Sequence, residues 1–262
     1  MNTNLRVFFG LEVEAPWPER LPAGRLVPAN GRHMTVAFLG NASEERIHQL
    51  LNAMPQQPFS VGGVGVTDRC FFTPNVVAWH LKWLGDGSPY ECYIAAIKDH
   101  CKGLNFEIDA RPFLPHVTIA RQPFEADEWK AAFSPIPVVV KALHLYQSLP
   151  QLDYRPIWTS EFIPPFVEIE HEADIAFHIQ AENMQQLGCN AQAALLFKFP
   201  DLIPFLETIP EGVTLDKIIQ SLNRTIAIAD SQIGSSVKAV SYHGEVTSNA
   251  DGLLSWEMII DV

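Results

Sequence analysis

Two short segments of this chain each place a histidine two residues before a threonine inside an apolar run. His33 and Thr35 form the first pair, and His116 and Thr118 form the second. Apolar, β-branched runs favour strands, and side chains at i and i+2 of a strand share a face. Each histidine is therefore expected beside its threonine. Two such imidazoles can divide general-acid and general-base work near neutral pH, while the hydroxyls donate hydrogen bonds to an anion such as a phosphoryl group.

One His-x-Thr pair is weak evidence, because a histidine in a strand is often a half-buried residue satisfied by the backbone. The duplication is what carries weight here. Each copy follows a turn that contains Gly31 or Pro115. Two copies in one domain indicate a paired acid–base site more strongly than they indicate two unrelated structural histidines.

The flanks of both pairs resemble the 2H phosphoesterase superfamily. Residues 33–40 read His-x-Thr-x-x-Phe-Leu-Gly, and the second copy lies between Arg111-Pro-Phe-Leu-Pro and Ala-Arg121. Within that superfamily the resemblance is to the LigT-like RNA 2′,3′-cyclic phosphodiesterases, also called 2′–5′ RNA ligases, and it spans residues 5–162. It implies an α+β fold with two pseudo-symmetric lobes that face each other across a cleft, with one motif in each lobe.

The same resemblance implies roles for the site residues. His33 would be the general acid and His116 the general base, although the reverse assignment is nearly as well supported by the sequence. Thr35, Thr118 and Arg121 would hold the non-bridging oxygens of a cyclic phosphate, where charge must be stabilised. Arg121 can equally be a solvated charge at the end of a strand. No metal or other cofactor is expected for this reaction.

Aromatic residues near the motifs have two readings. Phe38 is a candidate substrate contact that stacks on a base, but its apolar context favours packing in the core. Tyr146 and Tyr154 can stack on an unpaired base, and ordinary packing is again the more frequent role. His80 and His144 have no motif around them and are read as structural.

Composition limits the class of protein. The 262 residues suffice for one large or two ordinary domains, and 47% hydrophobic with 18% charged residues is typical of a soluble globular protein. The sequence shows no signal peptide and no apolar run of membrane-spanning length. The four cysteines form no CxxC or zinc-type spacing. We therefore expect reduced thiols and a cytoplasmic protein without a membrane partner.

The charge is unevenly distributed. Residues 1–163 hold 14 Lys and Arg against 16 Asp and Glu, whereas residues 164–262 hold 4 against 14. The net charges of −2 and −10 predict two domains, 1–163 and 164–262, with the boundary at Pro164. The total of −12 argues against broad nucleic-acid binding and against double-stranded DNA as a partner, and the acidic part is not expected to touch RNA phosphates.

Residues 170–175, Glu-His-Glu-Ala-Asp-Ile, together with 238–243 and 259–262, resemble archease. This resemblance implies a small α+β domain that assists a GTP-dependent RNA ligase and binds a divalent cation. Asp174, Asp201 and Asp261 are the candidate ligands for Ca²⁺ or Mg²⁺; the alternative is a solvated acidic face. The chain departs from the pattern, because Glu172 replaces the usual Thr and the segment before Ser236 is short.

The predicted elements alternate along the first domain. Strands are expected at 6–13, 59–66, 76–83, 114–121, 137–146 and 156–162. A helix capped by Ser43 and a second at 88–103, with a capping box opened by Ser88, lie between them. The Pro- and Gly-rich residues 15–31 are expected to be irregular. In the second domain, helices are expected at 182–197 and 214–230.

The sequence thus predicts an RNA 2′,3′-cyclic phosphodiesterase joined to an archease-like domain, with a link to tRNA or other RNA repair. Its partners would be RNA ends or small cyclic nucleotides, and a GTP-dependent RNA ligase. The alternative is a non-catalytic protein that binds RNA ends or assists a ligase. Reversible 2′–5′ ligation also stays open.

Overall fold

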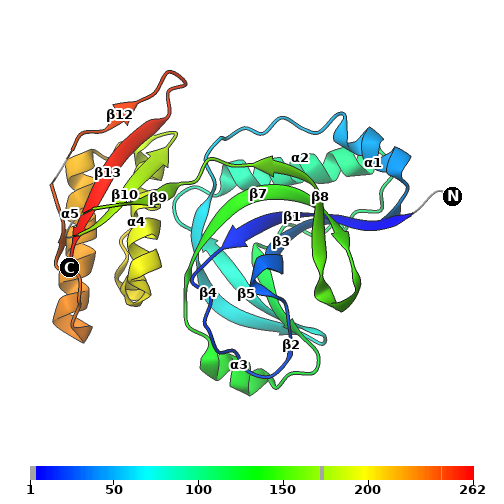
Figure 1. The fold of residues 1–262 in the computed structure, drawn as a ribbon, viewed down its shortest axis with the longest axis horizontal. Helices are drawn as coiled ribbons and strands as arrows, with labels where there is room; N and C mark the ends of the chain where they lie inside the picture. The colour runs from blue at the N-terminus through cyan, green and yellow to red at the C-terminus, as the bar shows by residue number, and fades with distance from the viewer. Residues whose placement is uncertain (1–3, 172–173, 243) are drawn as a thin grey trace.

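An eight-stranded antiparallel sheet dominates the N-terminal part of the chain (Figure 1). The structure, a computed structural model, describes residues 4–171, 174–242 and 244–262. The strands are β1 (Leu5–Glu14), β2 (Arg25–Leu26), β3 (His33–Ala42), β4 (Val64–Thr73), β5 (Val76–Trp83), β6 (His116–Arg121), β7 (Pro137–Ser148) and β8 (Tyr154–Glu161). The helices of this part are α1 (Glu44–Leu51), α2 (Ser88–Gly103) and α3 (Ala126–Ala132).

The sheet closes on itself. β7 pairs with β4 through its first residues and with β1 along most of its length, so the order β1-β3-β6-β5-β4-β7 returns to β1. The two pseudo-symmetric lobes facing each other across a cleft stay a prediction. In the closed sheet, β3 and β6, which carry the two motifs, are neighbours joined where Met34 pairs with Val117.

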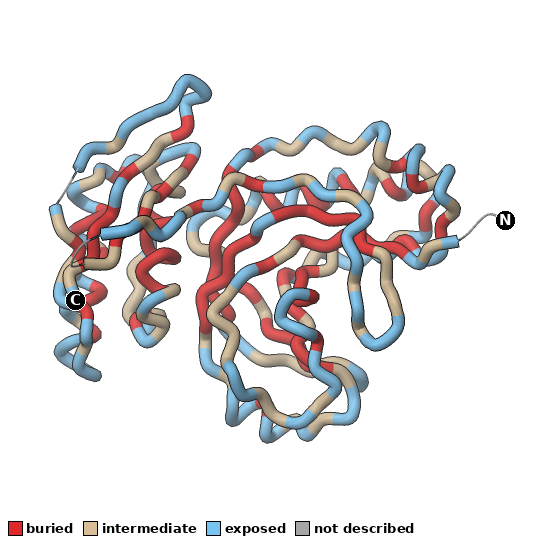
Figure 2. The backbone as a smooth tube through the Cα atoms, viewed as in Figure 1, coloured by how far each residue is buried: buried red, intermediate tan, exposed pale blue. Residues whose placement is uncertain are grey.

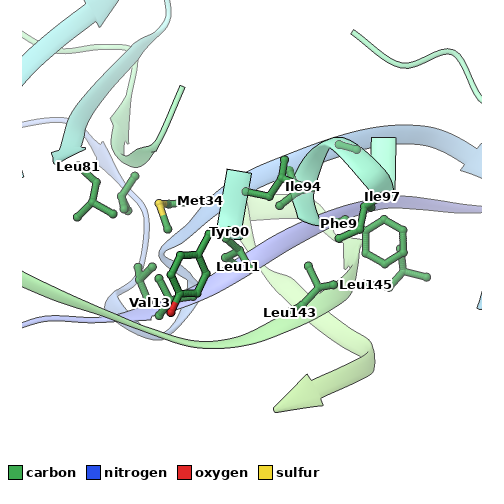
Figure 3. Close-up of a cluster of buried hydrophobic side chains, with 14 of the residues drawn as sticks. Phe9, Leu11, Val13, Met34, Leu81, Tyr90, Ile94, Ile97, Leu143 and Leu145 are labelled. Atoms are coloured by element: carbon green, nitrogen blue, oxygen red, sulfur yellow. The ribbon is translucent and has the colours of Figure 1, made fainter. Parts of the chain in front are cut away.

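One face of this sheet forms the main core. Leu11, Met34 and Leu143 pack with Ile94 and Ile97 of α2, as Figure 3 shows. The buried residues follow the strands in Figure 2. Since side chains alternate along a strand, the neighbours of Met34 on β3 must point to the opposite face.

The strand predicted at 59–66 is displaced, and this correction has a physical cause. β4 runs from Val64 to Thr73. The backbone N–H groups of Ser60 and Val61 instead donate to the carboxylate of Glu182, so they take no part in the ladder. A register shift between Thr67 and Arg69 breaks the apolar alternation that would have marked the later half of the strand.

The predicted capping box of α2 is also wrong. The N-cap residue is Gly87, and no side chain caps it. Ser88 directs its hydroxyl and its backbone N–H to the carboxylate of Asp86, at 2.8 and 2.9 Å. By contrast, Ser43 caps α1 as predicted, because its hydroxyl accepts the N–H of Arg46.

The C-terminal part is a second sheet covered by helices, which agrees with the predicted α+β class. Its elements are β9 (Phe166–Ile169), β10 (Ile175–Ala181), α4 (Met184–Lys198), a 3₁₀ helix (Pro200–Phe205), α5 (Leu215–Ile233), β11 (Ala239–Val240), β12 (Thr247–Ser248) and β13 (Leu254–Asp261). The strand order is β11-β13-β10-β9, and β12 also pairs with β13. No helix within the described ranges, the 19-residue α5 included, is long and apolar enough to cross a membrane.

The two parts share apolar contacts. Val64 and Val66 of β4, with Val139 of β7, belong to the core of the C-terminal part, which we call the shared core. α4 lies on the side of that part that faces β4 and β7 (Figure 1). The boundary near Pro164 is therefore a junction between two sheets that are packed together.

A fragment of residues 1–163 tests this junction. Its main core contains no residue beyond Phe162, so we predict that it folds. Removing the C-terminal part exposes Val64, Val66 and Val139, and we predict that the fragment associates at concentrations where the full chain does not. Sedimentation velocity and thermal melting measure both effects, and Val64→Thr with Val66→Thr should reduce the association. A fragment without a cooperative melt would mean that the two parts fold as one unit.

Candidate active site

The pairing of Met34 with Val117 organises the two motifs. Both residues are fully buried on the core face. Continuing this antiparallel register by one residue sets His33 opposite Thr118 and Thr35 opposite His116. All four side chains then share the other face of the sheet, and the two histidines stand on a diagonal, roughly 7–8 Å apart at Cα by standard sheet geometry. A group placed between them meets an imidazole from each side.

The two histidines are held in the same way. Nδ1 of His33 lies 2.8 Å from the carbonyl of Gly31, and Nδ1 of His116 lies 2.6 Å from the carbonyl of Leu114. Because a carbonyl only accepts, each Nδ1 must carry the proton. Nε2 is then the basic nitrogen of each neutral ring. The same i to i−2 contact in both copies orients both imidazoles without help from another side chain.

Both rings are neutral at pH 7. Burial lowers the pKa of His33 to about 4; the Gly31 carbonyl opposes this shift, whereas repulsion from the positive charge of Arg121 adds to it. Burial also lowers the pKa of His116, against the effect of the Leu114 carbonyl. His33 is 8% exposed. The cationic form of each ring therefore requires a nearby anion at neutral pH.

Gly10 of β1 makes room for the His33 ring. A β-carbon at this position would lie 3.1 Å from Cδ2 of His33 and 3.1 Å from Tyr146. Phe8 and Tyr154 also contact the imidazole, with ring centroids 4.8 and 4.9 Å away. These aromatic rings contribute to the burial that lowers the pKa of His33.

Arg32, beside His33, fixes the irregular segment 15–31. Its Nε donates to the carbonyl of Val27 at 3.2 Å, and its guanidinium lies 4.6 Å from the ring of Trp17. Burial lowers the pKa of Arg32 to about 10. The segment was predicted to be irregular, and its only regular elements in the described chain are β2 and a short 3₁₀ turn. The contacts of Arg32 therefore hold this segment next to the first motif.

The four motif residues line one cleft of about 1040 Å³. Five basic side chains and one carboxylate also line it: Arg6, Arg25, Lys98, Arg111, Arg121 and Asp109. Arg111 is engaged with Asp109. A basic cleft in a chain of net charge −12 concentrates positive potential where the histidines lie and favours an anionic ligand.

Arg121 belongs to the site. It ends β6 opposite Arg25 of β2, and its charge acts on His33. Its Nε is buried and has no hydrogen-bond partner in the described structure. Arg121 also lines the cleft, where a guanidinium can form charge-assisted hydrogen bonds with an oxyanion. This observation favours the anion-binding reading over a solvated strand-end charge.

Phe38 corrects the expectation of core packing. Its side chain is 59% exposed and lines the cleft, with its ring 5.5 Å from Phe8. Strict alternation along β3 would place Phe38 on the core face. Register shifts between β1 and β3 break this alternation and turn the side chain outward. Tyr154 lines the cleft as well, whereas Tyr146 is 3% exposed and packs behind His33.

Sequence reasoning missed a hydrogen-bonded chain behind the first motif. Glu12 pairs with His33 across β1 and β3, and its carboxylate lies 2.7 Å from Nε2 of His144, whose Nδ1 lies 2.8 Å from the hydroxyl of Thr159. The hydrogen bond from His144 lowers the pKa of Glu12. No motif in the sequence marks these residues, because their contacts depend on the register of β1 against β3 and β7. His80 is likewise paired, with Asp68 at 2.7 Å.

The predicted metal ligands lie in the C-terminal part. Because Ile175 pairs with Ile260, Asp174 and Asp261 sit at the same end of β10 and β13. The hydroxyl of Ser241 donates to both oxygens of Asp261, at 3.1 and 3.2 Å. Asp201 is exposed on the 3₁₀ helix after α4.

These carboxylates do not assemble into a ligand set. Among the residues whose placement is described, no three His, Cys, Asp or Glu side chains form a group that could hold a metal ion. Asp174 is instead 3.8 Å from Nδ1 of His171. The motif positions Glu172 and His243 lie outside the described residues. The Ca²⁺ or Mg²⁺ site stays a prediction from the resemblance.

Comparison with known proteins bears on the N-terminal part. No family model matches the chain. The RNA 2′,3′-cyclic phosphodiesterase of Thermotoga maritima is 29% identical over 140 residues, which are 47% of this chain and 69% of that protein. The protein of the same name from Geobacillus stearothermophilus is 30% identical over 111 residues, 39% of this chain and 33% of that protein. The chain is thus similar to phosphoric diester hydrolases, and the 2H phosphoesterase resemblance is supported.

Solved structures give a weaker likeness. Escherichia coli LigT complexed with 3′-AMP has a TM-score of 0.48 and 22% identity, covering 61% of this chain and 99% of that one. LigT in its apo form has a TM-score of 0.47 and 21% identity, covering 62% and 99%. A structure described as a phosphoesterase has a TM-score of 0.46 and 22% identity, covering 61% and 99%.

The neutral state of His33 has a measurable consequence. Its pKa of about 4 in the folded chain lies below the ordinary value, so the unfolded chain binds the proton first as the pH falls. Its full contribution to the free energy of unfolding is present above pH 6.5 and is lost towards pH 4, by up to about 3 kcal/mol. Urea unfolding between pH 7 and pH 4 should show this loss, and His33→Gln should reduce it. The exposed His48, changed to Gln, is the control; equal slopes in the two variants would contradict the shift.

Proposed function

We propose that this chain hydrolyses RNA 2′,3′-cyclic phosphates by acid–base catalysis between His33 and His116. The observation that carries the proposal is the duplicated His-x-Thr pair, with both Nδ1 atoms tied to backbone carbonyls and all four residues lining one basic cleft. The names of the two curated relatives support the substrate class.

The chemistry follows from the position of the two imidazoles. Hydrolysis requires water to attack phosphorus in line with the departing ribose oxygen. Nε2 of one neutral histidine removes a proton from the water, while the other histidine, protonated once the anionic substrate is bound, delivers its proton to the leaving oxygen. Imidazoles on a diagonal of two adjacent strands are suited to act on opposite sides of one phosphorus. This pair needs no metal for either proton transfer.

Charge on the non-bridging oxygens is stabilised by donors from both strands. The hydroxyls of Thr35 and Thr118 donate to these oxygens, and the guanidinium of Arg121, which lines the cleft, adds a charge-assisted hydrogen bond. Phe38 and Tyr154, at the cleft, offer rings on which the terminal base stacks. The five basic side chains extend the same potential to neighbouring phosphates.

The electrostatics favour His33 as the base and His116 as the acid, the reverse of the assignment implied by family resemblance. His33 is the more buried ring and also feels the positive charge of Arg121, so it keeps its lone pair most readily. The pKa of His116 is lowered by burial and, to a smaller extent, by repulsion from His80, but its ring is only partly buried. His116 therefore gains a proton more easily when a phosphate binds.

Substitution of either histidine tests the site. His33→Ala and His116→Ala should each lower turnover of an RNA 2′,3′-cyclic phosphate by a factor on the order of 10²–10⁴, with EDTA present throughout. Circular dichroism should show the folded state in both. Full activity in either variant would remove that histidine from the mechanism.

A substrate with a better leaving group separates the two roles. Catechol cyclic phosphate releases an aryloxide that needs little protonation, so loss of the general acid should matter less. On catechol cyclic phosphate, we expect the loss of activity in His116→Ala to be at least tenfold smaller than on the ribose substrate. In His33→Ala we expect the same loss of activity on both substrates. If His33→Ala shows the smaller loss instead, His33 is the acid and His116 the base, as the family resemblance implies.

A non-catalytic RNA-end-binding or ligase-accessory role is the second candidate. The acidic C-terminal part, with its archease-like motifs, favours it, because such a surface suits a basic protein partner. The intact histidines and threonines favour catalysis. The two differ in a single measurement: an accessory protein binds the cyclic phosphate without releasing product.

The C-terminal part is proposed to serve RNA ligation as archease does, with Ca²⁺ or Mg²⁺ bound where β10 begins and β13 ends. This requires Asp174 to turn from His171 towards Asp261. We expect millimolar Ca²⁺ to raise the melting temperature of the full chain by mass action, and Asp174→Ala with Asp261→Ala to abolish the increase. Asp251→Ala, at an exposed turn, is the control. If calorimetry detects no heat of binding, these carboxylates form only a solvated acidic face.

A further inference from the structure

His80 lies directly opposite His116 in the sheet. In the antiparallel pairing of β5 with β6, His80 and His116 are Cα partners, next to the pair formed by Trp79 and Val117. Directly opposite residues of an antiparallel pair project from the same face, with Cβ atoms about 4.5–5.5 Å apart. Trp79 and Val117 are buried in the core, so the two histidines lie side by side on the face that carries the motifs.

His80 lies outside the catalytic cleft. Ala78, the partner of Thr118 in the same pairing, lines the cleft, whereas His80 is not one of the lining residues. The side chains of β5 on this face therefore continue from the cleft wall at Ala78 to His80 beyond it. A group that does not reach the cleft cannot touch the substrate, so any effect of His80 on the reaction must act through His116.

A β-bulge holds the ring of His80. The register of β4 against β5 shifts between Thr67 and Arg69, which leaves Asp68 as the extra residue. Oδ1 of Asp68 lies 2.7 Å from Nδ1 of His80. Because an ionised carboxylate only accepts, Nδ1 carries a proton and Nε2 is the nitrogen that titrates. Bulges often re-aim side chains beside active sites, and this one fixes both the orientation and the tautomer of His80.

The charges around His80 are constant near neutral pH, apart from its own and that of His116. Oδ2 of Asp68 lies 3.2 Å from Nη1 of Arg69, so these two neighbours from β4 carry no net charge together. Lys82, two residues along β5, shares the face of His80 and is exposed. From β6 the facing titratable group is His116. The charge that His116 meets from this cluster therefore changes when Nε2 of His80 gains or loses a proton.

Each of the two imidazoles disfavours the cationic form of the other. Burial is the main cause of the lowered pKa of His116, and repulsion from His80 adds to it. From β3, His33 also faces His116 but is neutral at pH 7. The ring of Phe71, from β4, contacts His116 with centroids 5.5 Å apart and brings no charge. His80 is thus the neighbour whose protonation opposes that of His116.

We propose that His80, held by Asp68, is a positioning residue that controls when His116 takes up and releases its proton. This inference rests on the proposed function, in which His116 exchanges a proton with the substrate. A phosphate bound between the motifs attracts a proton to His116. Without an opposing charge that proton would be held too tightly, because a general acid works best with a pKa near the working pH. His80 offsets the attraction, so that His116 releases the proton to the leaving oxygen more readily.

NMR titration of the histidine ring protons tests the contact independently of catalysis. The His116 signal is assigned by its absence from the spectrum of His116→Ala. His80→Asn removes the repulsion, so His116 should gain its proton at a higher pH than in the unsubstituted protein. His80→Lys places a permanent positive charge at the same site and should move the titration of His116 to lower pH. An unchanged titration in both variants, or a shift in the same direction in both, would overturn the proposal.

His144 provides a matched control. It is another imidazole paired with a carboxylate at 2.7 Å, that of Glu12, but it lies on β7 and pairs with Gly10 rather than with β6. His144→Asn should therefore leave the titration of His116 where it is. If His144→Asn moves this titration as far as His80→Asn does, the effect does not come from the contact between opposite positions and the proposal is wrong.

The pH dependence of turnover extends the test to the reaction. Turnover of the cyclic phosphate falls at high pH as the general acid loses its proton. In His80→Asn this fall should begin at a higher pH. On the alkaline side its turnover, relative to its own optimum, should be about two- to fivefold that of the unsubstituted protein, as expected for one cross-strand charge contact. KM should not change, because His80 does not line the cleft.

Two outcomes separate this inference from the proposed function. A variant His80→Asn with lower turnover and the same pH profile would show that His80 only supports the fold, and the inference would fail while the proposed function holds. If the unsubstituted protein does not turn over the cyclic phosphate, but its His116 titrates as predicted in the variants, the proposed function fails and the electrostatic contact between His80 and His116 is confirmed.

Discussion

The pairing of Met34 with Val117 is the contact on which the candidate active site depends. It joins two strands that are 83 positions apart in the printed sequence, and it fixes which face each motif presents. A slip of either strand by one residue would send that strand's His and Thr into the core and bring its apolar neighbour, Met34 or Val117, to the cleft. The burial of these two side chains against α2 therefore stabilises the site as well as the sheet. Register here is set by packing, and the chemistry follows from the register.

The local arrangement of charged side chains, more than the net charge, determines where this chain can attract an anion. The net charge of −12 argues against a general affinity for phosphates, yet five basic side chains line the cleft that holds the two motifs. Burial lowers the pKa of both His33 and His116, and the positive charge of Arg121 lowers that of His33 further. An anionic ligand in the cleft would reverse that balance. The catalytic protonation state is thereby linked to occupancy of the cleft.

Motifs and periodicity predicted the elements that position the site, but they could not predict how the sheet closes. β1 and β5 lie where their apolar runs predicted them, and Ser43 caps α1 as its type requires. β4 was misplaced because a register shift breaks its alternation, and Phe38 was read as core because its outward turn depends on β1. Gly10, Glu12 and His144 could not be found from the sequence, since their roles arise from pairings between strands distant in the chain. Long-range register is the information that local patterns lack.

The junction between the two parts has consequences for both. Val64, Val66 and Val139 face the C-terminal core, while the opposite side of β7 carries Val138 and Val140 into the N-terminal core. A shift of α4 against β7 is therefore felt on both faces of one strand, and β7 pairs directly with β1, the strand that supports His33. Close-packed interiors transmit such shifts because they have few voids to absorb them. Packing along this junction is incomplete at one place, a cavity of about 500 Å³ lined by residues of both parts, and the contact between α4 and the sheet is least constrained there.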